Sequence, residues 1–454
     1  SSYGGVAGLT WAQNSFDNIT GAYVRGVSLN GYDNGNTALN VHADNNSDTY
    51  TIGPGVSAAG ANGAAAGAYA ANYGNNSTEA VVEKYAAGTA DAKDNVINKA
   101  SSIAVQAEDD SDVVTVAGSL EMAVSPSSAA VTVGGAVANT NIGTSDNKQS
   151  VRAALNDATI TMSGSADASD AASVSVQALN DANVVNLALG GGVAVSTSLV
   201  GVSAEGSVSV ADVHSGTLAT MNNVNLTADS KNVEVLARTD GDIVSSADAF
   251  NAVWGSTAEV GAGATVSVLN SDVDTKANVN GGSWSIKSAQ IDARGINSLY
   301  DIAMGFNAGG STVAAVNAQG NIAVNTLCND VEALVHNANI TASGDVSVEA
   351  DSDETLHNYA GLLAGAGSAT ASVGLGATVV VNTINGNTVA EIQNGALQAD
   401  DVDVYAHNMR RVNSSQTGIG VAVSAEGAGT VVGSVSVHDL EGTTKALVHN
   451  VNGS

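Results

Sequence analysis

The sequence is poor in cysteine, proline, aromatic residues and positive charge, and each shortage excludes something. With one cysteine in 454 residues, Cys328, no intramolecular disulfide can form. Two prolines and 4% aromatic residues leave no proline-rich linker between domains and few rings to fill a wide core. Lys and Arg number 14 against 44 Asp and Glu, so the formal charge is −30. Because phosphate binding requires clustered Lys and Arg, we expect no nucleic-acid partner.

Long apolar runs and long amphipathic helices are also scarce. No stretch of 18 or more residues has the uninterrupted apolar character of a membrane span, so we expect no membrane insertion. The segment Ser77–Lys99 is the one helical candidate, and an irregular turn is an equally good interpretation of it. The chain begins at Ser1 without Met, which we interpret as a processed product or as part of a longer polypeptide.

What the sequence does contain is a short strand-like segment that recurs seven times. The copies end at alanines 64, 71, 59, 56, 57 and 56 residues apart, namely Ala43, Ala107, Ala178, Ala237, Ala293, Ala350 and Ala406. Self-similarity at a roughly fixed period indicates stacked repeat units.

The repeated segment alternates with a period of two. The position two residues before each closing alanine is always β-branched: Val41, Val105, Val176, Val235, Ile291, Val348 and Val404. The position directly before it varies chemically: His42, Gln106, Gln177, Leu236, Asp292, Glu349 and Tyr405. Because successive side chains on a strand point to opposite faces, the first set is predicted to form an interior column and the second to face solvent.

Further strand-like segments fill each unit between Asn, Gly and Asp turns. Val331–Asn337, Thr388–Asn394 and Thr444–Asn450 precede the repeated segment, and Gly361–Ile384 follows it. This pattern is typical of all-β architectures. We predict one elongated β-solenoid over residues 1–454, built from units of about 56–71 residues with two to three coils per unit. Residues 1–31 are expected to form a junction or cap.

Two of these segments carry a family resemblance. The Val379–Ile384 type of segment and the Thr-x-Ala-x-Ile/Val-x-Asn segments resemble the repeats of leukotoxin-type filamentous adhesins, giant secreted proteins of bacterial surfaces. Those adhesins are similar in turn to filamentous haemagglutinin-like exoproteins of two-partner secretion systems. The resemblance runs from about Gly21 to Gly453. It implies an extracellular or cell-surface location, a right-handed β-helix, and adhesion to host or bacterial surface ligands. The secretion domain of that family is not visible, which leaves the secretion route open.

Acidic residues follow several copies of the repeated segment, and we interpret them as turns. Ca²⁺ takes six to eight oxygen ligands, so these residues are candidate calcium ligands. The four candidates are Asp110, Asp112, Asp351 and Asp353. However, the sequence has neither the Gly-Gly-x-Gly-x-Asp nonapeptide of calcium-binding β-rolls nor an EF-hand loop. Solvated acidic turns are therefore the favoured interpretation, and we expect no obligatory cofactor.

Both ends of the sequence lie inside a repeat unit. The open end of a stack of strands exposes unpaired edges, which template the addition of another chain. We therefore expect a head-to-tail homopolymer whose junction is formed by Tyr3, Trp11 and Phe16 on one side and Val448 and Val451 on the other. The alternatives are an N-terminal cap on a monomeric rod and covalent continuation of a longer chain.

These features together predict an extracellular bacterial surface filament or adhesin shaft, and not an enzyme. The alternatives are a fragment of a monomeric giant two-partner-secreted adhesin and a surface-layer or sheath protein. A β-helical polysaccharide lyase or hydrolase is less favoured, because such enzymes need carboxylates at a defined separation, often with an Arg or Lys. Here only six arginines are present and the acidic residues are spread over every unit. We expect no catalytic residue.

Overall fold

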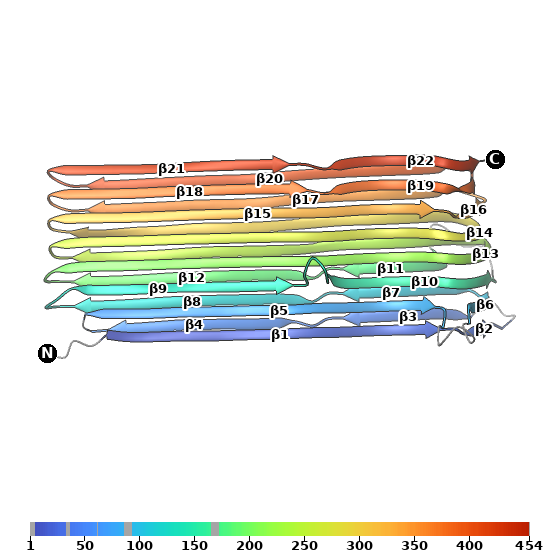
Figure 1. Cartoon of the computed structure of the whole chain (residues 1–454), viewed down its shortest axis with the longest axis horizontal. Coiled ribbons are helices and arrows are strands. Elements are labelled where there is room, and N and C mark those ends of the chain that lie inside the picture. The colour runs from blue at the N-terminus through green and yellow to red at the C-terminus, as the bar shows by residue number, and fades with distance from the viewer. Residues whose placement is uncertain (1–4, 33–36, 61, 86–92, 165–171, 454) are drawn as a thin grey trace.

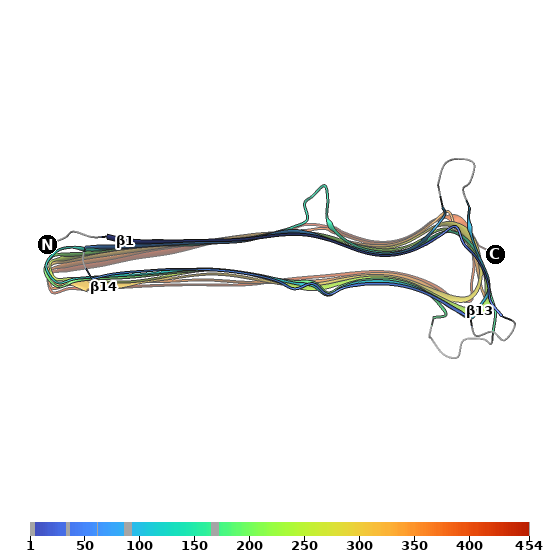
Figure 2. The same cartoon turned by 90° about the horizontal axis from the view of Figure 1, so that it is seen from below.

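The chain folds into stacked parallel strands that form two facing layers. The computed structural model describes residues 5–32, 37–60, 62–85, 93–164 and 172–453, and every regular element in these ranges is a strand. Each strand pairs in parallel with the strand that lies one circuit earlier in the chain (Figure 1). Seen along the stack, the passages trace two layers joined at both ends (Figure 2). The predicted all-β class is confirmed, and the described part of the helical candidate Ser77–Lys99 is extended chain.

We call the layer that contains β1 the first layer and the layer that contains β4 the second layer. The first layer, together with the short strands that follow its long ones, holds β1 (Gly5–Arg25), β2 (Ser28–Asn30), β5 (Gly63–Glu83), β6 (Asn95–Ala100), β9 (Ala130–Ile142), β10 (Gln149–Met162), β15 (Ala314–His336), β16 (Asn339–Ala342), β18 (Ala371–Asn385), β19 (Asn387–Gln398), β21 (Gly427–Leu440) and β22 (Thr443–Gly453).

The second layer holds β3 (Ala38–Asn45), β4 (Thr49–Ala59), β7 (Ser102–Asp109), β8 (Asp112–Ser125), β11 (Val174–Asn180), β12 (Asn183–Ser196), β17 (Val346–Gly367) and β20 (Val402–Val423). Two strands run through both layers and so complete a circuit each: β13 (Val200–Gly255) and β14 (Ala258–Ser311). Residues 143–148 leave the stack as a loop (Figure 2).

The sequence repeat corresponds to one circuit of the chain. Every closing alanine pairs with the next one in parallel register: Ala43 with Ala107, then Ala178, Ala237, Ala293, Ala350 and Ala406. The prediction of two to three coils per unit is therefore wrong, since no further coil lies between adjacent copies. The physical reason is strand length. Strands of 21 and 22 residues, such as β1 and β17, use about a third of a unit on one side of the stack, so one pass along each side and the connections between them complete the unit.

One acidic segment interpreted as a turn is part of a strand. Residues 351–354 lie inside β17, which continues to Gly367. The earlier segments do interrupt pairing, because β3 ends at Asn45 and β7 ends at Asp109. Continuous alternation of inward and outward side chains lets the later circuits run straight where the composition suggested a turn.

Each later circuit bends at one residue with a left-handed backbone. Asn337, Asn394 and Asn450 have φ of 56°, 53° and 54°, and they close the Thr-x-Ala-x-Ile/Val-x-Asn segments. Asn and Gly tolerate this conformation better than other residues, because the Cβ of most residues collides with the carbonyl oxygen there. The Asn450 side chain donates to Asn394 Oδ1 in the circuit beside it, so the bends are stacked on one another. The recurring Asn is therefore a corner residue.

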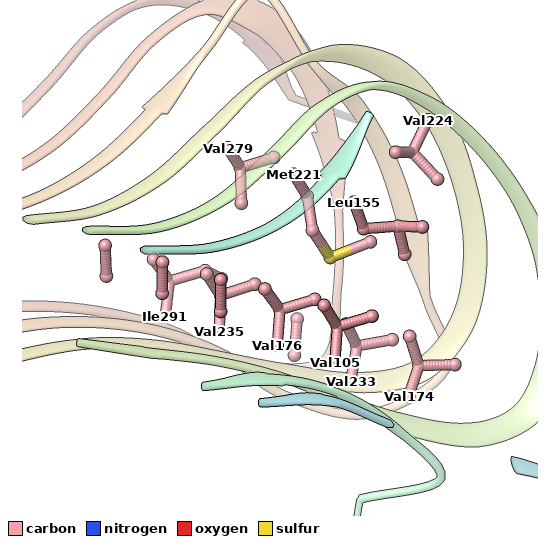
Figure 3. Close-up of a cluster of buried hydrophobic side chains, with 14 of the residues drawn as sticks. Val105, Leu155, Val174, Val176, Met221, Val224, Val233, Val235, Val279 and Ile291 are labelled. Carbon is pink, nitrogen blue, oxygen red and sulfur yellow. The ribbon is translucent and has the colours of Figure 1, made fainter. Parts of the chain in front are cut away.

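The predicted interior column of β-branched residues is confirmed. Val41, Val105, Val176, Val235, Ile291 and Val348 are all buried, whereas Val404 on the last circuit is only half-buried. Figure 3 shows four of them in a row: Val105, Val176, Val235 and Ile291. They face Leu155, Met221 and Val279 of the opposite layer. This cluster fills the wide end of the two-layer body.

The outward set is exposed or half-buried with one exception. Asp292 is 2% exposed, because Arg294 and Gln290 cover it and donate hydrogen bonds to its Oδ2, the first at 2.5 Å. The prediction that Asp292 faces open solvent is therefore wrong. Neighbouring circuits lie so close that an outward side chain can be buried by its own row.

The other half of the interior is lined by small polar side chains, and the two layers lie close together there. A continuous chain of hydrogen bonds connects the two layers in this half of the interior. It runs from the hydrogen bond between Thr51 and Asn72, at 2.5 Å, to the one between Ser245 and Ser267, at 2.9 Å. Its intermediate members are Thr115, Thr140, Asn186 and Ser209. Alanines such as Ala117, Ala138 and Ala188 fill the space beside it. Small side chains bring the layers close, and the polar groups of this chain of hydrogen bonds then pair across the gap.

The described chain is a plate that is long in the direction of its strands (Figure 1). One 21-residue strand spans about 70 Å, whereas seven spacings between the eight levels of the first layer give about 34 Å. The long axis of this chain thus differs from that of the predicted rod, which would extend along the stack.

The interior column yields a stability prediction. Val348→Asp places a carboxylate without a partner among buried apolar side chains, and we expect a loss of roughly 3–5 kcal/mol in the free energy of unfolding. Glu349→Ala, at the adjacent outward position, should stay within about 1 kcal/mol of the parent. Urea denaturation measures both, and similar losses from the two variants would contradict the observed strand orientation.

Candidate functional site

The two outermost levels of the stack carry strand edges with no partner among the described residues. β1 pairs with β5 on one side, and β20, β21 and β22 pair with β17, β18 and β19 on one side. The two levels lie at opposite ends of the stack (Figure 1). Each therefore presents a row of backbone N–H and C=O groups with the parallel spacing that a further circuit would need.

The residues predicted at the N-terminal side of the junction separate onto two faces. Trp11 points outward, is 73% exposed and lies against Tyr69 with ring centroids 4.4 Å apart. Phe16 points inward and packs against the apolar cluster that contains Ile142 and Leu269. It occupies space that a side chain at Gly74 would fill. The third predicted residue, Tyr3, lies outside the described residues.

The residues predicted at the C-terminal side both belong to the interior. Val448 pairs with the buried Ile392, yet it is 55% exposed because no described strand covers the last level. Val451 packs partly against the apolar cluster at the wide end. Phe16, Val448 and Val451 are thus inward side chains of the end levels. A further circuit of the same kind would cover them.

The four candidate calcium ligands are not brought together. Asp110 follows β7 and is exposed, and Asp112 accepts a hydrogen bond from Asn183 at 3.0 Å. Asp351 contacts His407 Nδ1 at 2.8 Å, and Asp353 lies 3.5 Å from Arg411. Among the described residues, no three His, Cys, Asp or Glu side chains are grouped in a way that could hold a metal ion. Two of the four carboxylates therefore already have a side-chain partner, His407 for Asp351 and Arg411 for Asp353.

Buried glutamates are a feature that the sequence interpretation missed. Glu121 and Glu205 come from facing layers and are 0% and 4% exposed, and Glu259 is 1% exposed. Glycines make room for them: a Cβ at Gly134 would collide with the carboxyl group of Glu121, and one at Gly192 with that of Glu205. The signal was present in the alternation Ser203-x-Glu205-x-Ser207-x-Ser209, which gives Glu205 the same face as three small polar residues of the interior.

Burial raises the pKa values of these carboxyl groups. Burial raises the pKa of Glu259 to about 7. The pKa of Glu205 is raised to about 10, first by burial and then by the hydrogen bond and charge of Glu121. Burial also raises the pKa of Asp301 to about 6, against the hydrogen bonds that it accepts. A protonated carboxyl group can donate a hydrogen bond and adds no charge to the narrow interior. Because these groups are enclosed, they cannot contact a polysaccharide in this structure.

No protein-family model matches this chain, and neither does any curated protein or solved structure. The described residues contain no helix that is long and apolar enough to span a bilayer.

The buried carboxyl groups predict a loss of stability as the pH rises. Their pKa values in the folded protein lie above the ordinary value near 4.5, so the folded state holds the proton longer than the unfolded chain does. The stabilisation is complete below pH 4.5 and, for Glu259, is lost as the pH rises through about 7. We expect Glu259→Gln to reduce the fall in melting temperature between pH 5 and pH 8. The outward Glu349→Gln variant controls for surface charge, and an equal pH dependence in both variants would refute the assignment to Glu259.

The acidic exterior predicts no dependence on calcium. Because Asp351 and Asp353 already lie beside His407 and Arg411, we expect a chelator to leave the melting temperature unchanged at matched ionic strength. Thermal scans with and without chelator measure this. A fall in the midpoint that added Ca²⁺ restores would show that the acidic residues bind the ion.

Proposed function

We propose that this chain is a segment of the shaft of an extracellular bacterial surface filament or adhesin, structural and adhesive in role, which extends by adding circuits head to tail. In this proposal the stack is a β-solenoid of the β-helix type and the protein has no enzymatic activity. A right-handed coil is expected, because crossover connections between parallel strands of one sheet are right-handed in about 98% of cases.

The observation that carries the proposal is the constant register of the column of closing alanines through the stack. From Ala43 to Ala406 the same column continues through seven circuits, and pairing is maintained up to β1 at one end and β20–β22 at the other. A structure whose every level templates the next is suited to extension. The half-buried Val404 and the exposed Val448 support this, since both are interior positions that only another circuit would bury.

The charge distribution supports a role in the open solvent. A net charge of −30 keeps such plates soluble and makes them repel one another except where specific surfaces fit. The resemblance of the repeats to filamentous adhesins supports the bacterial surface as the location. It also supports host or bacterial surface molecules as ligands.

Electron microscopy of the purified protein tests the proposal. We expect filaments of uniform width that lengthen with protein concentration, because a head-to-tail contact does not close on itself. Discrete particles of one fixed length at every concentration would instead favour a segment of a longer, monomeric adhesin.

A matched pair of substitutions at the last level tests the junction. Val448→Asp puts a charge on the interior column of β22, and we expect it to stop lengthwise growth. Leu447→Asp changes the adjacent outward position, which pairs with Glu391, and should leave growth intact. Filament length measured for both variants decides the question. Filaments of normal length from Val448→Asp would exclude this end as the junction.

A further inference from the structure

The narrow half of the second layer presents an outer surface that is almost free of charge. We call it the apolar face and define it as the outward, alternate residues of 52–58, 116–124, 187–195, 246–254, 302–310, 359–367 and 415–423. Asp248 is the single charged residue among these positions, all of which the structure describes. Its carboxylate accepts a hydrogen bond from Ser246 at 2.9 Å. The interior behind this face is polar, so the usual arrangement of a sheet is reversed here.

Large apolar side chains stand exposed on the apolar face in a single row. This row holds the exposed Val56, Leu120, Phe250, Phe306 and Ile419 and the half-buried Leu363, and Gly191 interrupts it between Leu120 and Phe250. Phe250 and Phe306 stack with their ring centroids 5.0 Å apart and are 44% and 36% exposed. Exposed apolar patches of this size on soluble proteins mark interaction surfaces.

The surface of the apolar face has projections and a hollow of matching scale. A hollow of about 620 Å³ lies among Leu189, Phe250, Met304, Phe306 and Leu363. It exists because Gly361 takes an outward position beside these large side chains. Rings and hollows on one surface allow two copies of that surface to interlock.

Flatness and area also favour a second sheet as the occupant. In Figure 2 the successive circuits nearly superimpose when seen along the stack, so the layers have little twist. Flat sheets of many strands are typically stabilised by stacking on another sheet. Six strands with nine residues each and one with seven cover about 1,000 Å², which exceeds the roughly 800 Å² that each partner contributes to a standard interface.

We propose that the apolar face binds the same face of a second copy of this chain, so that two plates pair side by side. This contact is independent of the head-to-tail junction, because it uses the outer surface of the second layer and not the ends of the stack. Pairing of the plates increases the width of the assembly, whereas the head-to-tail junction increases its length.

The charge distribution selects the orientation of the two copies. The half of the second layer beyond the apolar face carries outward Glu234, Asp240, Glu349, Asp351 and Asp353, and the outward Arg238, Arg294 and Arg411 offset only part of this negative charge. A two-fold axis parallel to the strands would place these acidic halves on one another. An axis parallel to the stack direction puts them on opposite flanks and keeps both stacks pointing the same way. Like-charge repulsion therefore favours the second arrangement, which sets the Phe250–Phe306 row against its own copy.

A matched pair of lysine substitutions in β14 tests the pairing. Phe306→Lys brings two ammonium groups together across the two-fold axis and should weaken pairing by at least about a hundredfold. Ile296→Lys adds the same charge at an outward position of equal exposure, 37% against 36%, but on the acidic half. It should leave pairing unchanged. Sedimentation equilibrium gives the association constants, and unfolding curves verify that both variants fold.

Cysteine cross-linking tests the orientation. In a Cys328→Ala background we expect Phe306→Cys to form a disulfide between copies under mild oxidation, and Ile296→Cys not to do so.

Microscopy separates the two contacts, because Phe306→Lys should halve the filament width without shortening the filaments. Three results would each overturn the proposal: unpaired parent plates, equal pairing by Phe306→Lys and the parent, or parent plates that bind phosphatidylcholine vesicles and do not pair.

Discussion

The structure depends on parallel backbone hydrogen bonding between successive circuits in constant register. Once Ala43 is paired with Ala107 and the same pairing continues to Ala406, each position of the repeat becomes a column through the stack. Columns then specialise because their side chains see the same surroundings at every level. This is why a residue such as Val348 has the same environment as Val105, four levels away.

Column specialisation divides the plate into two chemically different halves. At the wide end, Val, Ile and Leu fill the interior and acidic residues cover the outside. At the narrow end, Ala, Ser, Thr and Asn bring the layers together through hydrogen bonds, and apolar side chains face outward. An interior this narrow has no space for large apolar groups, so it is held together by polar contacts such as the hydrogen bonds that connect Thr115, Thr140 and Asn186.

The two halves provide for two modes of assembly that do not compete. Strand edges at the end levels offer directional, register-matched hydrogen bonds, which suit growth along the stack. The apolar face offers a large contact area that does not by itself fix the orientation of a second copy. Repulsion between the acidic halves restricts that orientation. Together, the proposals describe a fibre of two plates in width, apolar at its centre and acidic along both flanks.

The sequence by itself determined the strand content, the repeat and the inward column. Each of these follows from the alternation of side chains on a strand and from a period that can be counted. It also placed the recurring Asn of residues 337, 394 and 450 correctly at the end of a segment, because the left-handed bend leaves a local chemical signature.

Other features were decided only by the tertiary structure. That one unit is a single circuit, that Asp351 lies in a strand, and that Asp292 is buried all depend on which rows lie beside each other. The alternation of Ser203 to Ser209 and of Val202 to Val210 is equally regular on both faces. A period of two separates two faces, but it does not say which one is inside. The distance between the layers decides that, and it depends on the fit of both layers at once.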